Sequence, residues 1–305
     1  MIRHMFPAMG GTIELQLVHG GDADIDRVAA LFAAHERAMS RFLPDSELCA
    51  LNASAGAPFR ASPLLFDAVS EAAGWAAVTD GIFDPTVIDA LEASGYDRPF
   101  DEIEGRGGIA VAARPAPATR TQRWRGIRFD YEHETITLPA DVRIDLGGIG
   151  KGLTVDHAIA ALDPGSSVMV NASGDLYAAG DGPGGDGWYV GVADPFSADD
   201  DIAMLNINDR GVATSGSVRR NWLAGDARYH HLIDTREGTS SRSGLATVTV
   251  VAVTATQADV LAKTAFLLGA EEGLRMIERF AGAECLAVTQ QCDVLLSSGM
   301  AEYFA

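Results

Sequence analysis

Alternating and helical spacings of apolar residues divide the chain into predicted strands and helices. Residues 12–18 alternate as an edge-type strand, and residues 24–40 carry apolar side chains at helical spacing. Ser62 is the expected N-cap of a helix over residues 63–78, whose first residue is a proline. The fold is therefore expected to open with a strand followed by helices.

Beyond residue 126 short strand patterns predominate, and helical patterns interrupt them without strict alternation. The expected elements are strands near residues 127–138, 168–172, 203–208 and 247–253, a hairpin over 178–192, helices over 151–162 and 256–268, and, after a further segment over 271–280, a closing pair of strands. This mixture favours an α+β fold over a doubly wound parallel sheet. Residues 95–125, rich in Gly, Pro, Arg and Ala, are interpreted as an irregular excursion within a single domain that spans residues 1–305.

Composition and charge narrow the class of protein. The 305 residues are 47% hydrophobic and 21% charged, and the net charge of −19 disfavours nucleic acid and anionic membrane surfaces as partners. No apolar stretch approaches the ~20 residues of a transmembrane helix, and the first residues lack a signal-peptide pattern, so a cytoplasmic protein is expected. The three cysteines show no metal-binding spacing and are interpreted as reduced thiols.

The lysines are a sharper compositional feature. Lys151 and Lys263 are the two lysines among 23 Lys and Arg residues. An ammonium group is a compact point charge, whereas a guanidinium group is larger and planar. Two hypotheses follow: these positions require a compact cation, or the retention of lysine there is accidental.

Two segments contain residues suited to phosphate binding or proton transfer. The glycine-rich segment IDLGGIGKG (residues 144–152) could hold a phosphate through backbone N–H groups at a helix N-terminus. It matches neither the P-loop nor the Rossmann pattern, and a purely structural turn is the alternative. In YHHLIDTREG (residues 229–238), His230 and His231 face opposite ways on a strand, so one of them is expected to line a site.

These two segments belong to an ordered series of nine motifs. The series comprises MGGT (9–12), SRFLPDSELCALN (40–52), GIFDPTV (81–87), IDLGGIGKGLTVD (144–156), VNASGDL (170–176), WYVGVADP (188–195), VATSGSVRR (212–220), YHHLIDTREG (229–238) and ADVLAKTAFLLG (258–269). It covers nearly the whole chain and resembles the ApbE family of FAD:protein FMN transferases.

The resemblance implies a T-fold-like α+β domain of two intimately packed halves, with FAD in a cleft between them. It also implies transfer of FMN from FAD to a threonine or serine hydroxyl of an acceptor protein, with release of AMP. Such a phosphoryl transfer depends on neutralising phosphate charge and on positioning the nucleophile. An FAD pyrophosphatase and an FAD-binding protein with an altered metal site are the alternatives.

The same resemblance assigns residues to the site. The residues expected to contact FAD come from five motifs and are Met9, Phe42, Ile82, Phe83, Asp84, Asp145, Lys151 and Leu232. Aromatic rings could pack on the ring systems of FAD and aspartates could accept from its ribose or adenine, whereas core packing is the alternative for the phenylalanines. His231 matches the family histidine, which implies general-base or phosphate-orienting duty.

The chain departs from the family pattern at three places. Thr235 stands where proline is usual, and Ser173 stands where glycine is usual. The third departure concerns the expected Mg²⁺, for which the family places an aspartate and, four residues later, a threonine on one helix, together with a backbone carbonyl of the glycine-rich turn. Asp259 and Gly148 match that set, but Lys263 occupies the fourth position.

Thr264 cannot replace the missing threonine, because a residue five positions on lies about 140° around the helix from Asp259. Three hypotheses follow. Lys263 replaces the metal as a catalytic point charge paired with Asp259, or Mg²⁺ binds through Asp259, the Gly148 carbonyl and the ligand phosphates. Otherwise Asp259 and Lys263 form an ordinary helix salt bridge in a protein that has lost the activity.

Overall fold

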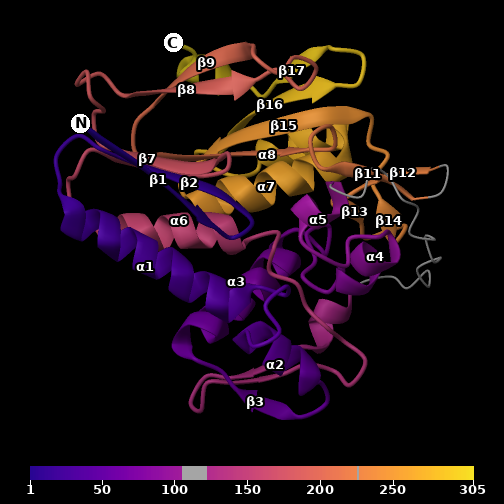
Figure 1. Ribbon diagram of the computed structural model, residues 1–305. Coiled ribbons are helices and arrows are strands. Elements are labelled where there is room, and N and C mark those ends of the chain that lie inside the picture. The colour runs from indigo at the N-terminus through magenta and orange to yellow at the C-terminus, as the bar shows by residue number, and fades with distance from the viewer. Residues whose placement is uncertain (105–121, 225–226) are drawn as a thin grey trace. The chain divides into compact units, whose positions relative to one another are not determined.

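The computed structural model describes residues 1–104, 122–224 and 227–305 (Figure 1). The chain divides into two compact units. The first unit comprises residues 1–34, 151–219 and 243–305, and the second comprises residues 35–150 and 220–242. Most of the predicted excursion, residues 105–121, lies outside the described residues. The expectation of a single domain stays a prediction.

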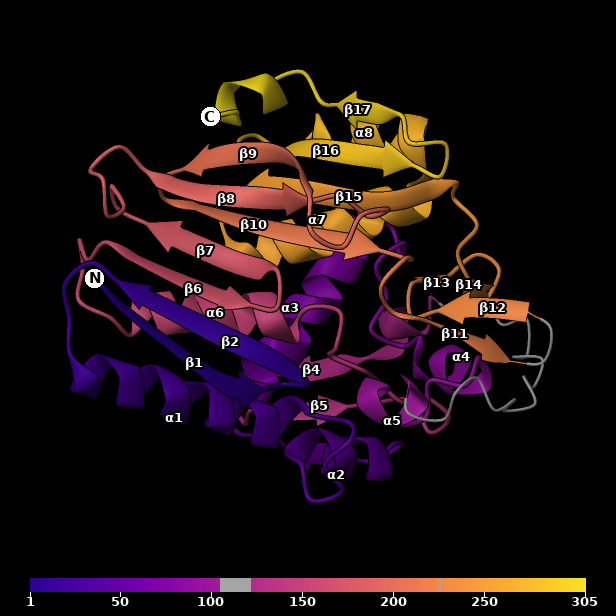
Figure 2. The same ribbon diagram turned by 45° about the horizontal axis from the view of Figure 1, so that its top comes forward.

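The first unit is built on an eight-stranded sheet in which every neighbouring pair is antiparallel (Figure 2). In sheet order its strands are β1 (Ile2–Ala8), β2 (Gly11–Leu17), β6 (Val168–Ala172), β7 (Asp175–Ala179), β10 (Arg210–Gly216), β15 (Leu245–Ala252), β16 (Glu284–Thr289) and β17 (Val294–Leu296). An antiparallel sheet with segregated helices is α+β, so the predicted fold class is confirmed.

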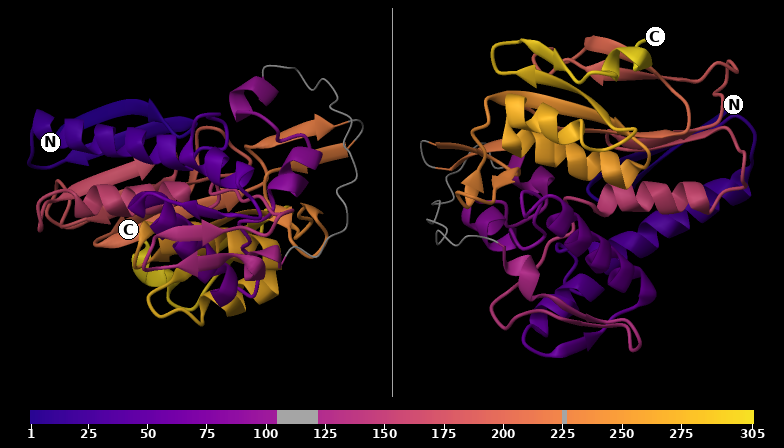
Figure 3. Two further views of the ribbon diagram at one scale, coloured as in Figure 1. Left: turned by 90° about the horizontal axis from the view of Figure 1, so that it is seen from below. Right: turned by 180° about the vertical axis from the view of Figure 1, so that it is seen from behind.

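Each face of this sheet is covered by a different kind of element. Helices α1 (Asp22–Met39), α6 (Gly150–Ala160), α7 (Ala255–Leu268) and α8 (Ala270–Ile277) gather on one side, as the rear view in Figure 3 shows. On that side Val168 and Val170 pack with Phe32 of α1 and Val155 of α6. The ribbon of β8 (Trp188–Ala193) and β9 (Asp201–Ile207) covers the opposite face, where Leu176 and Ala178 pack with Trp188.

Two strand predictions were wrong in detail. β2 is not an edge strand, because β1 pairs along its whole length; the half-exposed pattern of β1 carries little apolar alternation and gave no sequence signal. The predicted hairpin over residues 178–192 does not form, because β7 pairs with β6 and β10 whereas β8 pairs with β9. The glycine-rich turn reverses the chain but leads it from one sheet into the other.

The second unit consists of short strands and of helices of which α3 is the longest. They are α2 (Glu47–Ala53), β3 (Pro58–Arg60), α3 (Pro63–Val78), α4 (Ile88–Ala93), α5 (Phe100–Glu104), the 3₁₀ turn Arg123–Gly126, β4 (Arg128–Asp130), β5 (Thr135–Thr137), β11 (Asn221–Ala224), β12 (Ala227–His230), β13 (Ile233–Asp234) and β14 (Thr239–Ser240). The Ser62 hydroxyl accepts from Leu65 N at 3.3 Å, which confirms the predicted cap of α3. Among the described residues no helix is long and apolar enough to span a membrane.

Helix α6 of the first unit holds the N-terminal end of α7. The Asp156 carboxylate on α6 accepts from the backbone N–H groups of Ala255 and Thr256 at 2.8 and 2.9 Å, and from the Thr256 hydroxyl at 2.6 Å. These bonds satisfy donors of the first turn of α7, which a helix leaves without intrahelical partners. Gly152 permits this approach, because a Cβ there would lie 2.7 Å from the Ala255 carbonyl oxygen.

Gly152→Ala should therefore destabilise the protein, although alanine is normally the better helix former. We expect a loss of about 1–3 kcal/mol in the free energy of unfolding, because the methyl group would meet backbone atoms that cannot move independently. The matched control is Gly74→Ala in α3, where a Cβ has open space and the change should stabilise by up to about 1 kcal/mol. Denaturant unfolding of both variants checks the prediction, and equal responses would contradict the packing argument.

Candidate active site

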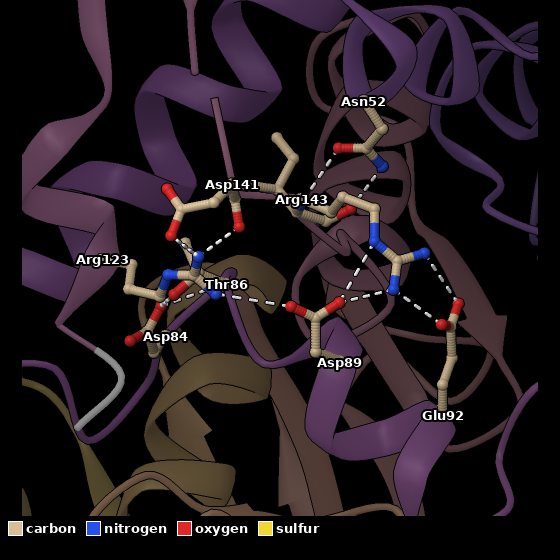
Figure 4. Close-up of polar contacts among 9 residues, drawn as sticks. Asn52, Asp84, Thr86, Asp89, Glu92, Arg123, Asp141 and Arg143 are labelled. Carbon is tan, nitrogen blue, oxygen red and sulfur yellow. Dashed lines mark hydrogen bonds and ion pairs between the residues drawn. The ribbon is translucent and has the colours of Figure 1, made fainter. Parts of the chain in front are cut away.

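Three of the motifs meet through backbone hydrogen bonds within the second unit. The Asn52 side chain donates to the Ile144 carbonyl at 2.9 Å and accepts from Ile144 N at 2.8 Å (Figure 4). Asp145 N donates to the Pro85 carbonyl at 2.8 Å. The segment that carries Asp145 and Gly148 is thus fixed to both neighbouring motifs, as a site of defined geometry requires.

Asp145 lies in a charge-paired, aromatic environment. Arg41 Nε is 3.3 Å from Asp145 Oδ1, and the Arg41 guanidinium carbon is 4.1 Å from the centre of the Phe42 ring and 4.7 Å from that of Tyr96. Burial raises the pKa of Asp145, while the Arg41 charge and the Gly147 N–H act to lower it. Trp222 extends the cluster, with its ring centre 5.4 Å from that of Tyr96. The structure therefore brings Phe42 and Asp145 together.

The GIFDPT turn is held by hydroxyl groups. The buried Asp84 accepts from Thr86 N at 2.8 Å and from the Thr86 hydroxyl at 2.6 Å, and Phe83 N donates to the Thr79 hydroxyl at 3.2 Å. Phe83 is buried whereas Ile82 is half-buried. The Thr235 hydroxyl donates to the Gly81 carbonyl at 2.8 Å, a bond that the usual proline could not form.

A network of ion pairs also joins the segment that follows Asp84 to the segment that precedes Asp145. Arg143 bonds Asp89 and Glu92 of α4, with 2.7 Å between Arg143 Nη2 and Glu92 Oε2, and Arg123 contacts Asp89 at 3.4 Å (Figure 4). These groups are partly exposed, so each pair contributes on the order of 1 kcal/mol or less. Their main effect is to fix positions. Asp89 follows Asp84 closely in sequence and Arg143 precedes Asp145, so the network holds the two segments that carry Asp84 and Asp145. None of the motifs indicated this network in advance.

The two adjacent histidines have different surroundings. His230 Nε2 donates to the Ser241 carbonyl at 2.9 Å, and His230 Nδ1 accepts from Leu232 N at 3.3 Å. Both ring nitrogens thus form hydrogen bonds with backbone groups, and Leu232 is buried beside them. Burial lowers the pKa of His230, which is consistent with a neutral structural ring. His231 is half-buried and follows strand β12 rather than lying on it.

The first unit holds Met9 in the turn between β1 and β2. Met9 and Gly10 have φ values of 52° and 69°, as the type I′ turn of a two-residue hairpin requires. Ser173, at φ 57°, bonds this turn, because its hydroxyl accepts from Thr12 N and donates to the Thr12 carbonyl, both at 3.1 Å. A Cβ on Gly11 would lie 2.1 Å from Ser173 Oγ, so a side chain there would force the Ser173 hydroxyl to move and give up these bonds.

Both lysines form ion pairs with buried aspartates in the first unit. Lys151 pairs with Asp175 of the VNASGDL motif, and Lys263 pairs with Asp259 on α7. Gly152 N donates to Asp259 Oδ2 at 3.4 Å, which places Asp259 beside the residue that follows Lys151. Each ammonium group thus neutralises a buried carboxylate of the first unit.

The donor set at Asp259 does not fit Mg²⁺. One carboxylate oxygen bonds the Lys263 ammonium and the other accepts from Gly152, while the buried Thr264 hydroxyl donates to the Val260 carbonyl at 2.8 Å. A divalent cation about 4 Å from an ammonium group would be repelled by about 8 kcal/mol at an effective dielectric constant of about 20. Among the described residues no group of three or more His, Cys, Asp or Glu could hold a metal.

The fold has close counterparts among solved structures. An ApbE protein from Thermotoga maritima matches with a TM-score of 0.82 at 24% identity, over all of this chain and 99% of that one. The flavinyl transferase ApbE from Pseudomonas stutzeri matches with a TM-score of 0.80 at 23% identity, over 99% of this chain and 96% of that one. The fold is thus that of flavin transferases.

Sequence comparison identifies the family. The model of the ApbE family matches residues 9–287, and the chain belongs to that family. The FAD:protein FMN transferase of Treponema pallidum is 27% identical over 92% of this chain and 81% of its own length. That of Escherichia coli strain K12 is 26% identical over 88% of this chain and 77% of its own.

The predicted site residues fall into two groups. The second unit contains Phe42, Ile82, Phe83, Asp84, Asp145, Gly148, His231 and Leu232, and the first contains Met9, Lys151, Asp259 and Lys263. Sequence reasoning missed the partners Arg41, Tyr96 and Asp175. Arg41 and Asp175 stand inside two of the nine motifs, so a search for oppositely charged residues among the motifs could have found them.

The neutral His230 ring makes stability depend on pH. Its folded pKa lies below the ordinary 6.5, so the unfolded chain takes up the proton first and stability falls as pH drops through this window, by at most about 1.4 kcal/mol per pH unit. His230→Gln should lose less stability than the wild type between about pH 7.5 and about pH 5.5. Urea unfolding at both pH values measures this difference, and parallel losses would contradict it.

Proposed function

We propose that this protein is an FAD:protein FMN transferase that attaches FMN to a threonine or serine hydroxyl of an acceptor protein and releases AMP. The observation that carries the proposal is the family match over most of the chain, together with relatives of that activity aligned over more than three quarters of their own length. The fixed motifs of the second unit and the paired lysines of the first supply groups suited to an anionic dinucleotide.

The proposed reaction is a phosphoryl transfer. The acceptor hydroxyl oxygen attacks the FMN-side phosphorus of FAD, a new P–O ester bond forms, and the bond from that phosphorus to the bridging oxygen breaks. AMP leaves with the bridging oxygen, and the hydroxyl proton passes to a base. The protein contributes mainly by alignment and by stabilising charge on the phosphate oxygens.

We assign the base to His231. His230 is engaged by the backbone on both ring nitrogens, which leaves its half-buried neighbour as the histidine of this motif for proton transfer. An imidazole with a pKa near neutrality can accept a proton from a hydroxyl nucleophile and release it to water.

The FAD contacts divide by chemistry. Phe42, already in an aromatic and cationic cluster, is the ring that packs on a ring system of FAD, whereas the buried Phe83 supports the turn. Asp84 and Asp145 accept from ribose or adenine donors, and Met9, Ile82 and Leu232 provide apolar contacts. Lys151 places a compact positive charge at the start of α6 for the pyrophosphate.

The proposal is tested by incubating the protein with FAD and an acceptor domain, then measuring the acceptor by intact mass spectrometry. We expect the acceptor to gain the mass of one FMN and AMP to appear in equal amount. The Escherichia coli relative, assayed on the same domain, establishes that the acceptor is competent. AMP release without a modified acceptor would indicate FAD hydrolysis, and intact FAD beside a competent acceptor would contradict the proposal.

His231→Ala separates chemistry from binding. We expect the transfer rate to fall by about 10²–10⁴-fold, the usual contribution of a general base, while FAD affinity by fluorescence quenching stays close to that of the wild type. The control is His133→Ala, which removes an exposed histidine paired with Asp130 and should leave the rate unchanged. Loss of FAD binding in His231→Ala would make this residue a ligand contact instead of a base.

A further inference from the structure

The Asp259–Lys263 pair on α7 differs from an ordinary helix salt bridge. The side chains of Asp259 and Lys263 are 1% and 14% exposed, whereas those of Glu271 and Arg275, which form a pair of the same spacing on α8, are 83% and 64% exposed. Exposed pairs add little stability, and removing a lysine from water costs free energy that one ion pair offsets only where the geometry is good and further hydrogen bonds satisfy the ammonium group. The burial of Lys263 therefore indicates a role beyond holding α7.

We infer that the Lys263 ammonium group replaces the divalent cation at Asp259, so that FMN transfer by this protein does not require Mg²⁺. The inference deepens the proposed function and rests on it for the catalytic use of the charge. Occupation of the site by Lys263 can be measured without any transfer.

The hydrogen bonds of the ammonium group support this replacement. Lys263 Nζ donates to Asp259 Oδ1 and, at 3.4 Å, to the Asp259 carbonyl. An ammonium has three N–H donors, so within the described part of the chain one donor remains for an oxygen atom of a ligand. A phosphate oxygen is the acceptor that a compact ammonium binds best, as the phosphate-binding lysine of P-loop proteins illustrates.

The second lysine provides a matching charge on the neighbouring helix. Lys151 pairs with Asp175, and the next residue, Gly152, donates its backbone N–H to Asp259. Asp259 thus connects the start of α6, which carries Lys151, with the turn of α7 that carries Lys263. Two fixed ammonium groups in one unit suit the two negative charges of the pyrophosphate.

The test begins with metal binding, measured by Mn²⁺ electron paramagnetic resonance on the purified protein with and without saturating FAD. Wild-type protein should bind no Mn²⁺ beyond that held by FAD alone. Lys263→Thr places a hydroxyl oxygen four residues after Asp259, and carboxylate and hydroxyl oxygens suit hard cations. This variant should bind one Mn²⁺ per chain, at least about tenfold more tightly than the wild-type protein does under the same conditions. Arg275→Thr is the matched control and should behave as the wild type, since it removes the cation of the exposed pair.

The second measurement follows transfer to the acceptor domain in Mg²⁺ and in EDTA. We expect equal wild-type rates in both, and a Lys263→Thr rate that falls at least about tenfold in EDTA, since loss of the cation leaves the phosphate charge unscreened. The inference is overturned if wild-type protein binds one Mn²⁺ that Asp259→Asn abolishes, or if EDTA stops wild-type transfer. If this protein transfers no FMN in any condition while the Escherichia coli relative modifies the same acceptor, the proposed function is overturned. The Mn²⁺ measurement still decides whether Lys263 or a metal ion occupies the site at Asp259.

Discussion

The carboxylate of Asp156 is the contact on which the candidate chemistry of the first unit depends. It holds the first turn of α7 against α6 through Ala255 and Thr256. Burial raises the pKa of Asp156, and the bonds from Thr256 and Ala255 act against that shift, so the carboxylate is costly to bury and is compensated by the helix end it caps. Because α6 carries Lys151 and α7 carries Asp259 and Lys263, this interaction helps to set how the two helices present both lysines.

Elements whose information is local were predictable from the sequence. The cap of α3, the strand β6 and the bounds of α7 depend on neighbours a few residues away, and each prediction agreed with the structure to within one residue. Strand β1 was missed although its partner β2 follows after a two-residue turn, because its half-exposed side chains carry little apolar alternation. The partner of β8 was misjudged because β7 and β9 are both its neighbours in sequence, and apolar spacing does not tell which of them pairs with it. The α+β class survived these errors because it depends on the mixture of elements and not on their pairing.

The candidate site shows the same division between local and long-range information. Phe42, Asp84 and Asp145 were found because they stand in recognisable motifs. Arg41 was missed as the partner of Asp145 although it adjoins Phe42, because the ion pair joins residues far apart in sequence. Arg143 and Asp89 lie at the edges of motifs, and their network could be recognised only once α4 was placed beside the segment before Asp145.

The contact between Ser173 and Gly11 constrains how this lineage can change. The Ser173 hydroxyl occupies the space that a side chain at position 11 would need, and it bonds both backbone groups of Thr12. A chain with glycine at position 173 leaves that space empty, so a side chain at position 11 meets no hydroxyl there. With serine at position 173, a side chain at position 11 would displace this hydroxyl and break its two bonds to Thr12. The two positions should therefore covary among relatives, with serine at one predicting glycine at the other.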